Sequence, residues 1–65
     1  MDEALHAYGM GHADGMAGVP DDARASHPDT GADYRAGLSD GSHAAFERDL
    51  MAAVRRALDM PPGDR

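Results

Sequence analysis

A pattern of eleven residues occurs twice in this chain, with an offset of 26 residues. It reads Y-x-x-G-x-x-D-G-x-x-small. Its first copy consists of Tyr8, Gly11, Asp14, Gly15 and Gly18, and its second of Tyr34, Gly37, Asp40, Gly41 and Ala44. Spacings of three and four residues place side chains on one face of an α-helix. The repeat therefore predicts two related helical segments.

The glycines of the repeat predict a close contact between helices. Glycine inside a helix costs up to ~1 kcal/mol relative to alanine, so several in one helix need a compensating gain. Small residues at this spacing let another backbone approach closely. We assign helix packing to five glycines: Gly11, Gly15, Gly18, Gly37 and Gly41. Two alternatives are a weak helix that is partly disordered until it binds, and a homodimer in which glycine stripes pack across a two-fold axis.

Capping residues predict where the first helix begins and ends. Asp2 can cap the first turn, and Gly18 suits the left-handed conformation that ends many helices. Val19 and Pro20 follow, and proline cannot continue a helix. We therefore expect a helix over residues 3–17. Its larger side chains would share one face: Met1, Leu5, Tyr8, His12, Met16 and Val19.

The next segment, residues 19–30, is rich in proline and aspartate and is typical of a loop. A short helical turn can begin at Pro20, because proline is favoured in the first turn of a helix. Thr30, with Asp33 three residues later, resembles a capping box. We expect the second long helical segment to start there.

This second segment extends to about Asp59, before Pro61 and Pro62. Residues 40–42, Asp-Gly-Ser, favour a break that leaves a short middle helix and a final helix from about residue 43. The larger and small apolar side chains follow one face: Tyr34, Leu38, Ala45, Phe46, Leu50, Ala53, Val54, Ala57 and Leu58.

The chain is too short for a large core. Chains below about 70 to 80 residues seldom gain more than ~3 to 5 kcal/mol from one core, and this one has 65 residues, no cysteine, one Phe and two Tyr. We predict an all-α fold, a small helical hairpin or three-helix domain with a Pro/Asp-rich loop between the first and second helices. This single domain would span residues 1–60, with a disordered tail at 61–65.

Charge is distributed unevenly along the chain. The net charge is −6, and all of it lies in residues 1–34, where Arg24 is the only base. A field of this kind acts on partner choice and association rate. Without lysine, the chain is poorly suited to bind nucleic acid or anionic lipid directly. No apolar run approaches the ~20 residues of a membrane span, so we expect a cytoplasmic protein.

No residue pattern points to catalysis, a cofactor or a metal. Helical zinc pairs place two histidines four residues apart, and no pair has that spacing among His6, His12, His27 and His43. The glycines do not follow a strand, so they form no phosphate-binding loop. We therefore expect a protein that is not an enzyme and that acts through a partner.

Two resemblances bear on that partner. Residues 14–18, Asp-Gly-Met-Ala-Gly, the later segment Tyr34–Gly37 and the proline-bearing loop between them resemble ribosome modulation factor over about residues 7–44. That family is strongly basic and binds ribosomal RNA, whereas this chain is acidic. In size, acidity and lack of catalytic motifs the chain is similar to small phage inhibitors, including anti-CRISPR proteins that mimic DNA, and this resemblance implies that it acts in the cytoplasm of a bacterial host.

The leading hypothesis is a non-enzymatic inhibitor whose acidic surface blocks a basic nucleic-acid-binding site on a larger protein, such as a Cas protein. Carboxylates on a rigid frame can present charge as duplex phosphates do. The predicted contact residues are Glu3, Asp14, Asp21, Asp22, Asp29, Asp33 and Asp40. The alternative is a ribosome-associated stress or hibernation factor. In either case we expect a monomer or a weak homodimer.

Overall fold

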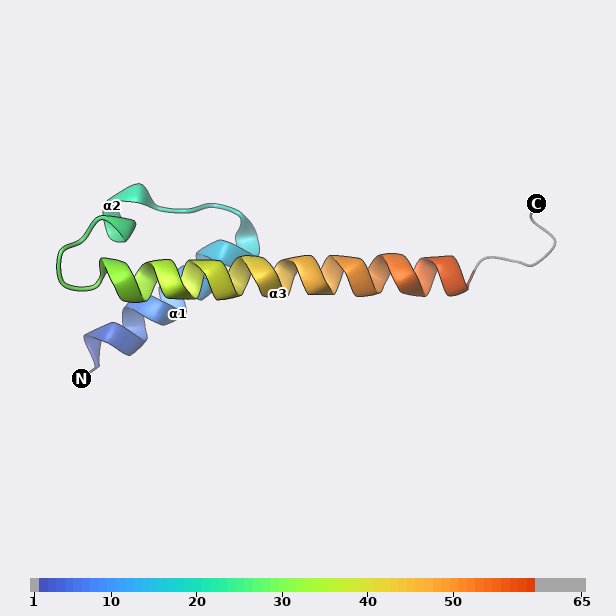
Figure 1. Cartoon of the computed structure of the whole chain (residues 1–65), viewed down its shortest axis with the longest axis horizontal. Helices are drawn as coiled ribbons and strands as arrows, with labels where there is room; N and C mark the ends of the chain where they lie inside the picture. Colours follow the sequence, from blue (N-terminus) through green and yellow to red (C-terminus); the bar gives the residue numbers. More distant parts are fainter. Residues whose placement is uncertain (1, 60–65) are drawn as a thin grey trace.

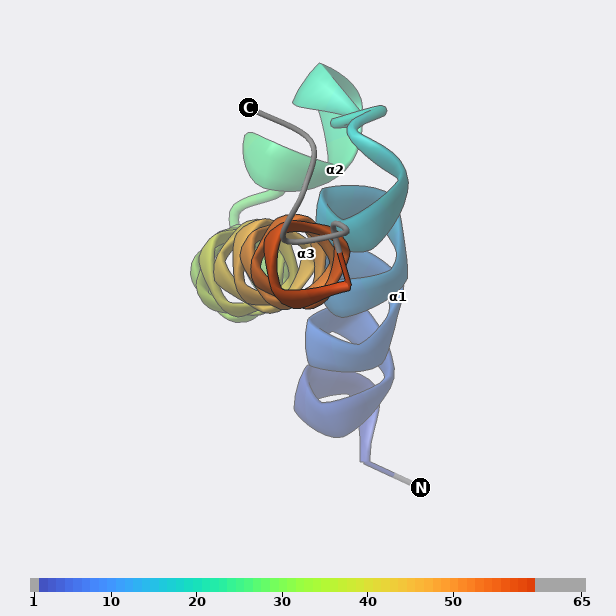
Figure 2. The ribbon, with the colours of Figure 1, turned by 90° about the vertical axis from the view of Figure 1, so that its right-hand side faces the viewer.

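The computed structural model describes residues 2–59, which form three helices: α1, Glu3–Ala17, α2, Asp22–Ala25, and α3, Gly31–Leu58. Within this part of the chain there is no strand, so the all-α prediction is confirmed. α1 lies obliquely across the first half of α3, and the second half of α3 extends beyond it (Figure 1). The view along α3 shows α1 passing beside it and α2 above (Figure 2). The predicted tail at 61–65 lies outside the described residues.

The predicted bounds of α1 are confirmed. The Asp2 carboxylate accepts a hydrogen bond from the backbone N–H of Leu5 at 3.1 Å, and thereby caps the first turn. At the other end, Gly18 has a φ of 73° and donates its N–H to the carbonyl of Gly15 at 3.3 Å. Only glycine adopts this conformation without strain, so Gly18 ends the helix as expected.

The loop after α1 contains the predicted helical turn. The Asp21 carboxylate accepts hydrogen bonds from the backbone N–H groups of Ala23 and Arg24 at 3.0 and 3.2 Å, and so starts α2. The capping box predicted at Thr30 is wrong, because the Thr30 side chain caps no N–H group of α3. Instead, the carbonyl of His27 accepts the N–H of Gly31 at 2.8 Å.

The break predicted at residues 40–42 is wrong, because α3 is continuous from Gly31 to Leu58. At 1.5 Å per residue a helix of 28 residues is about 42 Å long. Gly41 is buried where α1 crosses, so this glycine serves contact rather than termination.

The core differs from the predicted apolar stripes. Leu5 and Val19, predicted to share one face of the first helix with its other large side chains, are 66% and 59% exposed. Among the described residues, Tyr34 is the only large side chain that is fully buried, at 1% exposure. The other buried positions are glycines: Gly11, Gly15, Gly31, Gly37 and Gly41. The helices therefore meet backbone to backbone, and the larger apolar side chains stay at the surface.

Candidate functional site

The α1–α3 contact is built from equivalent glycines of the two repeats. A Cβ on Gly11 would overlap the carbonyl oxygen of Tyr34 and lie 2.8 Å from the nitrogen of Leu38. A Cβ on Gly37 would overlap the carbonyl oxygen of Tyr8 and lie 2.9 Å from the nitrogen of His12. Tyr8 and His12 in the first repeat correspond to Tyr34 and Leu38 in the second. The contact is therefore reciprocal.

Gly15 and Gly41 form a second reciprocal contact of the same kind. A Cβ on Gly15 would overlap the carbonyl oxygen of Leu38, and one on Gly41 would overlap that of His12. The two repeats are thus related by an approximate two-fold axis that passes between the helices. Gly18 differs from these four, because a Cβ there would meet nothing within 4 Å. Its assignment to helix packing is wrong, since it only ends α1.

Two tyrosine–aspartate hydrogen bonds close this contact. The hydroxyl of Tyr34 donates to the Asp14 carboxylate at 2.5 Å. The hydroxyl of Tyr8 donates to the Asp40 carboxylate. Each tyrosine of one repeat therefore binds the aspartate of the other. The repeat itself carries this signal, since each copy contains one tyrosine and one aspartate, although both aspartates were predicted to bind a partner.

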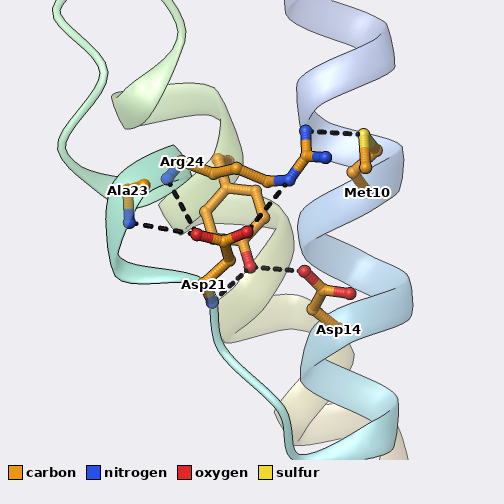
Figure 3. Close-up of polar contacts among 6 residues, drawn as sticks. Met10, Asp14, Asp21, Ala23 and Arg24 are labelled. Atoms are coloured by element: carbon orange, nitrogen blue, oxygen red, sulfur yellow. Dashed lines mark hydrogen bonds and ion pairs between the residues drawn. The ribbon is translucent and has the colours of Figure 1, made fainter.

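The Tyr34 hydroxyl also accepts a hydrogen bond from the backbone N–H of Asp21 at 2.9 Å, which fastens the loop to the helix pair. Figure 3 shows the surroundings of Asp21, whose carboxylate lies 3.3 Å from Nε of Arg24. Nη1 of Arg24 in turn donates to the sulfur of Met10 on α1 at 3.1 Å. Arg24, the only arginine in residues 1–34, is therefore held by contacts within the fold.

These contacts raise the pKa of both tyrosines above the ordinary value of 10.0. For Tyr34, burial of the hydroxyl raises the pKa most, followed by its hydrogen bond to Asp14. For Tyr8, the hydrogen bond to Asp40 is the largest cause. In both cases the neutral phenol is favoured, since a phenolate would lose its hydrogen bond and face a carboxylate.

We expect the stability of the fold to fall as the pH rises above about 10. The folded state holds the two phenolic protons more tightly than the unfolded chain does. Their stabilisation is therefore complete below the unfolded pKa and is lost as the pH rises through the folded values. The chain has no lysine and no cysteine, so tyrosine is the only side chain that titrates near pH 10. Urea midpoints from about pH 8 to about pH 12, with phenolate absorbance, would measure this.

A flat urea midpoint across this range would contradict the expectation. The double variant Tyr8→Phe with Tyr34→Phe is the control, because it has no titrating phenol and its midpoint should not depend on pH in this window.

The structure divides the seven predicted partner-binding carboxylates into two groups. Asp14 and Asp40 accept from tyrosines, and Asp21 caps α2 and pairs with Arg24. Within residues 2–59, the side chains of the other four form no hydrogen bond or ion pair: Glu3, Asp22, Asp29 and Asp33. Of these four, only Asp33 is half-buried. We call these four residues the free acidic group.

The free acidic group lies at one end of the molecule. Its members belong to the first turn of α1, the first turn of α2, the loop before α3, and the first turn of α3. All of these segments are far from the end of α3 near Leu58 (Figure 1). In that far half, Glu47 lies 3.3 Å from Nε2 of His43, and Asp49 lies 3.4 Å from Nε of Arg48. The excess of negative charge in the first half of the sequence therefore lies at one end of the molecule as well.

An open groove of about 330 Å³ lies between α1 and the α2 segment. Its lining includes Glu3, His6, Arg24 and His27. Nδ1 of His27 already accepts backbone N–H groups, that of Asp29 at 3.1 Å among them. Within residues 2–59, no group of three histidine or carboxylate side chains is placed to hold a metal ion.

The second half of α3 carries a row of exposed apolar side chains. Its members, which we call the α3 stripe, are Phe46, Leu50, Met51, Val54 and Leu58. Neither α1 nor α2 covers them, because α1 crosses α3 nearer its start (Figure 1). Apart from Met51, these residues were predicted to share one face of the second helical segment, and that face is exposed here.

No helix in the described part of the chain combines the length and the apolar character needed to span a membrane. Comparison of the chain with protein-family models, with curated proteins and with solved structures gives no match.

Proposed function

We propose that this protein is a non-enzymatic binding protein that places its acidic end on a basic, nucleic-acid-binding site of a larger protein and so keeps nucleic acid out. A phage anti-CRISPR protein that acts on a DNA-recognising Cas subunit is the concrete form of this proposal. The observation that carries it is the position of the free acidic group, at one end of a molecule whose other end is close to neutral.

The physical argument rests on unpaired charge. A carboxylate that is already bound within the fold offers little to a partner, because its contacts must first be broken. The free acidic group has no such contacts, and the arginines of the same end are engaged within the fold, Arg24 with Asp21 and Met10 and Arg35 with the carbonyl of Ala25. Attraction between this end and a cluster of lysine and arginine would speed association and would be screened by salt.

The proposed contact surface is smaller than the seven carboxylates predicted from the sequence. Asp14 and Asp40 accept hydrogen bonds across the α1–α3 contact and the Asp21 carboxylate caps α2, so replacing any of them would alter the fold as well as the charge. Asp22 and Asp29 are the sharper choice for a test, because both are exposed and neither side chain forms a hydrogen bond or ion pair in the described structure.

We expect the double variant Asp22→Asn with Asp29→Asn to lose its protein partners. The tagged wild-type chain would capture basic nucleic-acid-binding proteins from nuclease-treated bacterial lysate at low salt, and the variant would capture at least about ten-fold less. Glu47→Gln with Asp59→Asn removes the same charge from the far half of α3 and should capture as the wild type does. Mass spectrometry would identify the captured proteins.

A second step tests the blocking of nucleic acid. Adding a DNA duplex to the loaded resin should release the captured protein, because both ligands would compete for one basic site. Equal capture by both double variants, or retention of the partner in excess DNA, would contradict the proposal. Co-sedimentation with intact ribosomes in a lysate that has not been treated with nuclease would instead support the ribosome-associated alternative.

A further inference from the structure

The turn before α3 contains a histidine whose ring accepts backbone hydrogen bonds. Nδ1 of His27 accepts the N–H of Asp29 at 3.1 Å and that of Thr30 at 3.3 Å. The carbonyl of His27 accepts the N–H of Gly31, the first residue of α3, at 2.8 Å. Pro28, the remaining residue of the turn, has no N–H group. His27 therefore satisfies every N–H group between itself and the start of α3.

This arrangement matches the cap that Asn, Asp, Ser and Thr side chains form at helix starts. Such a side chain accepts from the N–H groups two or three residues later, and proline is favoured at the position directly after the cap. Thr30, the residue directly before α3, caps nothing with its side chain. His27 is therefore the capping side chain at this end of α3. It differs from asparagine, serine and threonine because its acceptor atom can take up a proton.

The charge of the ring decides whether Nδ1 can accept. A neutral imidazole has one N–H and one acceptor nitrogen, so the two hydrogen bonds require that the proton is on Nε2. A protonated imidazole has an N–H on both nitrogens and accepts nothing. Nδ1 of a protonated His27 would then face the N–H groups of Asp29 and Thr30 with an N–H of its own. Histidine is the side chain that ordinarily changes its charge between about pH 5 and pH 8.

Charged and titratable groups from all three helices lie near His27. Four of them line the same groove: Glu3 and His6 of α1, Arg24 of α2 and Tyr34 of α3. Asp29 belongs to the turn itself, and Arg35 of α3 binds the carbonyl of Ala25, two residues before His27. The carboxylates attract a charged ring and the arginines repel it. These groups influence the pH at which the ring is protonated, but they cannot make a protonated Nδ1 an acceptor.

We propose that His27 is a pH-sensitive cap, which holds the turn before α3 while its ring is neutral and releases the turn when its ring is protonated. Release frees the backbone of Asp29, a member of the free acidic group, and adds a positive charge to the acidic end. Both changes disfavour a basic partner, and this consequence alone rests on the proposed function. The cap itself requires no partner.

Two variants of His27 separate the acceptor from the charge. His27→Asn keeps an acceptor in the same place, because Oδ1 of asparagine and Nδ1 of histidine are both bonded to Cγ, and asparagine does not titrate. His27→Ala removes the acceptor. At about pH 8, His27→Asn should be at least as stable to urea as the wild type, and His27→Ala should be less stable than both.

Acidification should then distinguish the wild type from His27→Asn. The closed turn requires a neutral ring, so its contribution to stability is complete above the titration range of histidine and is lost as the pH falls through it. At about pH 5 the unfolding equilibrium constant of the wild type should rise about five-fold relative to that of His27→Asn, which is the usual effect of losing a helix cap. The other histidines are common to both chains and cancel in this comparison.

Nitrogen NMR of the histidine rings gives a readout that a purely structural role would not change. At about pH 8, Nε2 of His27 should carry the proton and Nδ1 should carry none. On acidification, the amide signals of Asp29 and Thr30 should shift with the same midpoint as the ring, and in His27→Asn this shift should be absent.

Three results would overturn the proposal: a proton on Nδ1 at about pH 8, a wild type whose stability follows that of His27→Asn at every pH, or a His27→Asn variant as unstable as His27→Ala. None of these measurements involves a partner, so their outcome is separate from that of the capture experiment.

Discussion

Alanine in place of Gly11 is expected to unfold the protein, although the change adds a single methyl group to a helix. Its Cβ would overlap the carbonyl oxygen of Tyr34 and lie 2.8 Å from the nitrogen of Leu38, both of which are backbone atoms of α3. Backbone cannot turn aside as a side chain can, so α1 would have to move away from α3. Overpacking of this kind costs about 1–3 kcal/mol or more, which is comparable with the ~3–5 kcal/mol available to so small a chain.

Gly9→Ala is the matched control, because Gly9 lies in the same helix and a Cβ there would meet nothing within 4 Å. Alanine is the better helix former, so this variant should be more stable than the wild type by up to about 1 kcal/mol. Far-UV circular dichroism and urea denaturation would measure both changes. Gly37→Ala, the equivalent change in the second repeat, should match Gly11→Ala. If Gly11→Ala raised stability as Gly9→Ala does, the close contact of the helices would be disproved.

The second large effect is expected for Tyr34→Phe. This change keeps the buried ring and removes one hydroxyl that donates to Asp14 and accepts from the backbone N–H of Asp21. Leaving a buried polar group without its partner costs about 1–3 kcal/mol. We expect a loss of about 2–3 kcal/mol, because two groups lose their partner at once. For a chain of this size, the folded population would fall greatly.

Tyr8→Phe is the matched control, because it removes the equivalent hydroxyl from the other repeat. Tyr8 makes the equivalent hydrogen bond to Asp40, but its surroundings are more exposed and no backbone N–H group depends on it. Its loss should cost about 1 kcal/mol or less. Equal urea midpoints for the two variants would show that the bond from Asp21 to Tyr34 contributes nothing.

The sequence predicts the helices of this fold well wherever one residue has one role. Asp2 and Gly18 mark the ends of α1 through local hydrogen bonds and a local conformation, so their neighbours in the chain are sufficient to identify them. The spacing of Gly11 and Gly15 likewise indicates a close helix contact, because nothing local compensates glycine in a helix interior.

The errors arise where one residue type has two uses. Gly41 beside Asp40 and Ser42 is typical of a helix end, yet Gly41 here admits the backbone of α1. Whether Gly41 ends a helix or admits another backbone depends on α1, which lies about 26 residues earlier in the chain. Periodicity also predicted that the larger apolar residues share one face of each helix, but it could not show which face is in contact, because helices that meet through glycines come too close for most large side chains to lie between them.

The candidate site was predicted only in outline. The excess of acidic residues near the start of the chain is visible in the sequence, but the role of each one depends on distant partners. Asp14 and Asp40 serve the tyrosines of the opposite repeat, while Asp22 and Asp29 remain free. The equivalence of the two repeats could have suggested the roles of Asp14 and Asp40. The exposure of the α3 stripe could not be predicted, because it depends on where α1 crosses α3.

The approximate two-fold relation between the repeats makes α1 and the first half of α3 interchangeable as binding partners. None of their contacts requires that both helices belong to one molecule. A chain whose loop at residues 19–30 was shortened until α1 could not fold back would still satisfy every glycine contact and both tyrosine bonds by exchanging α1 with another chain. Loop length thus selects between a self-contained protein and a domain-swapped one.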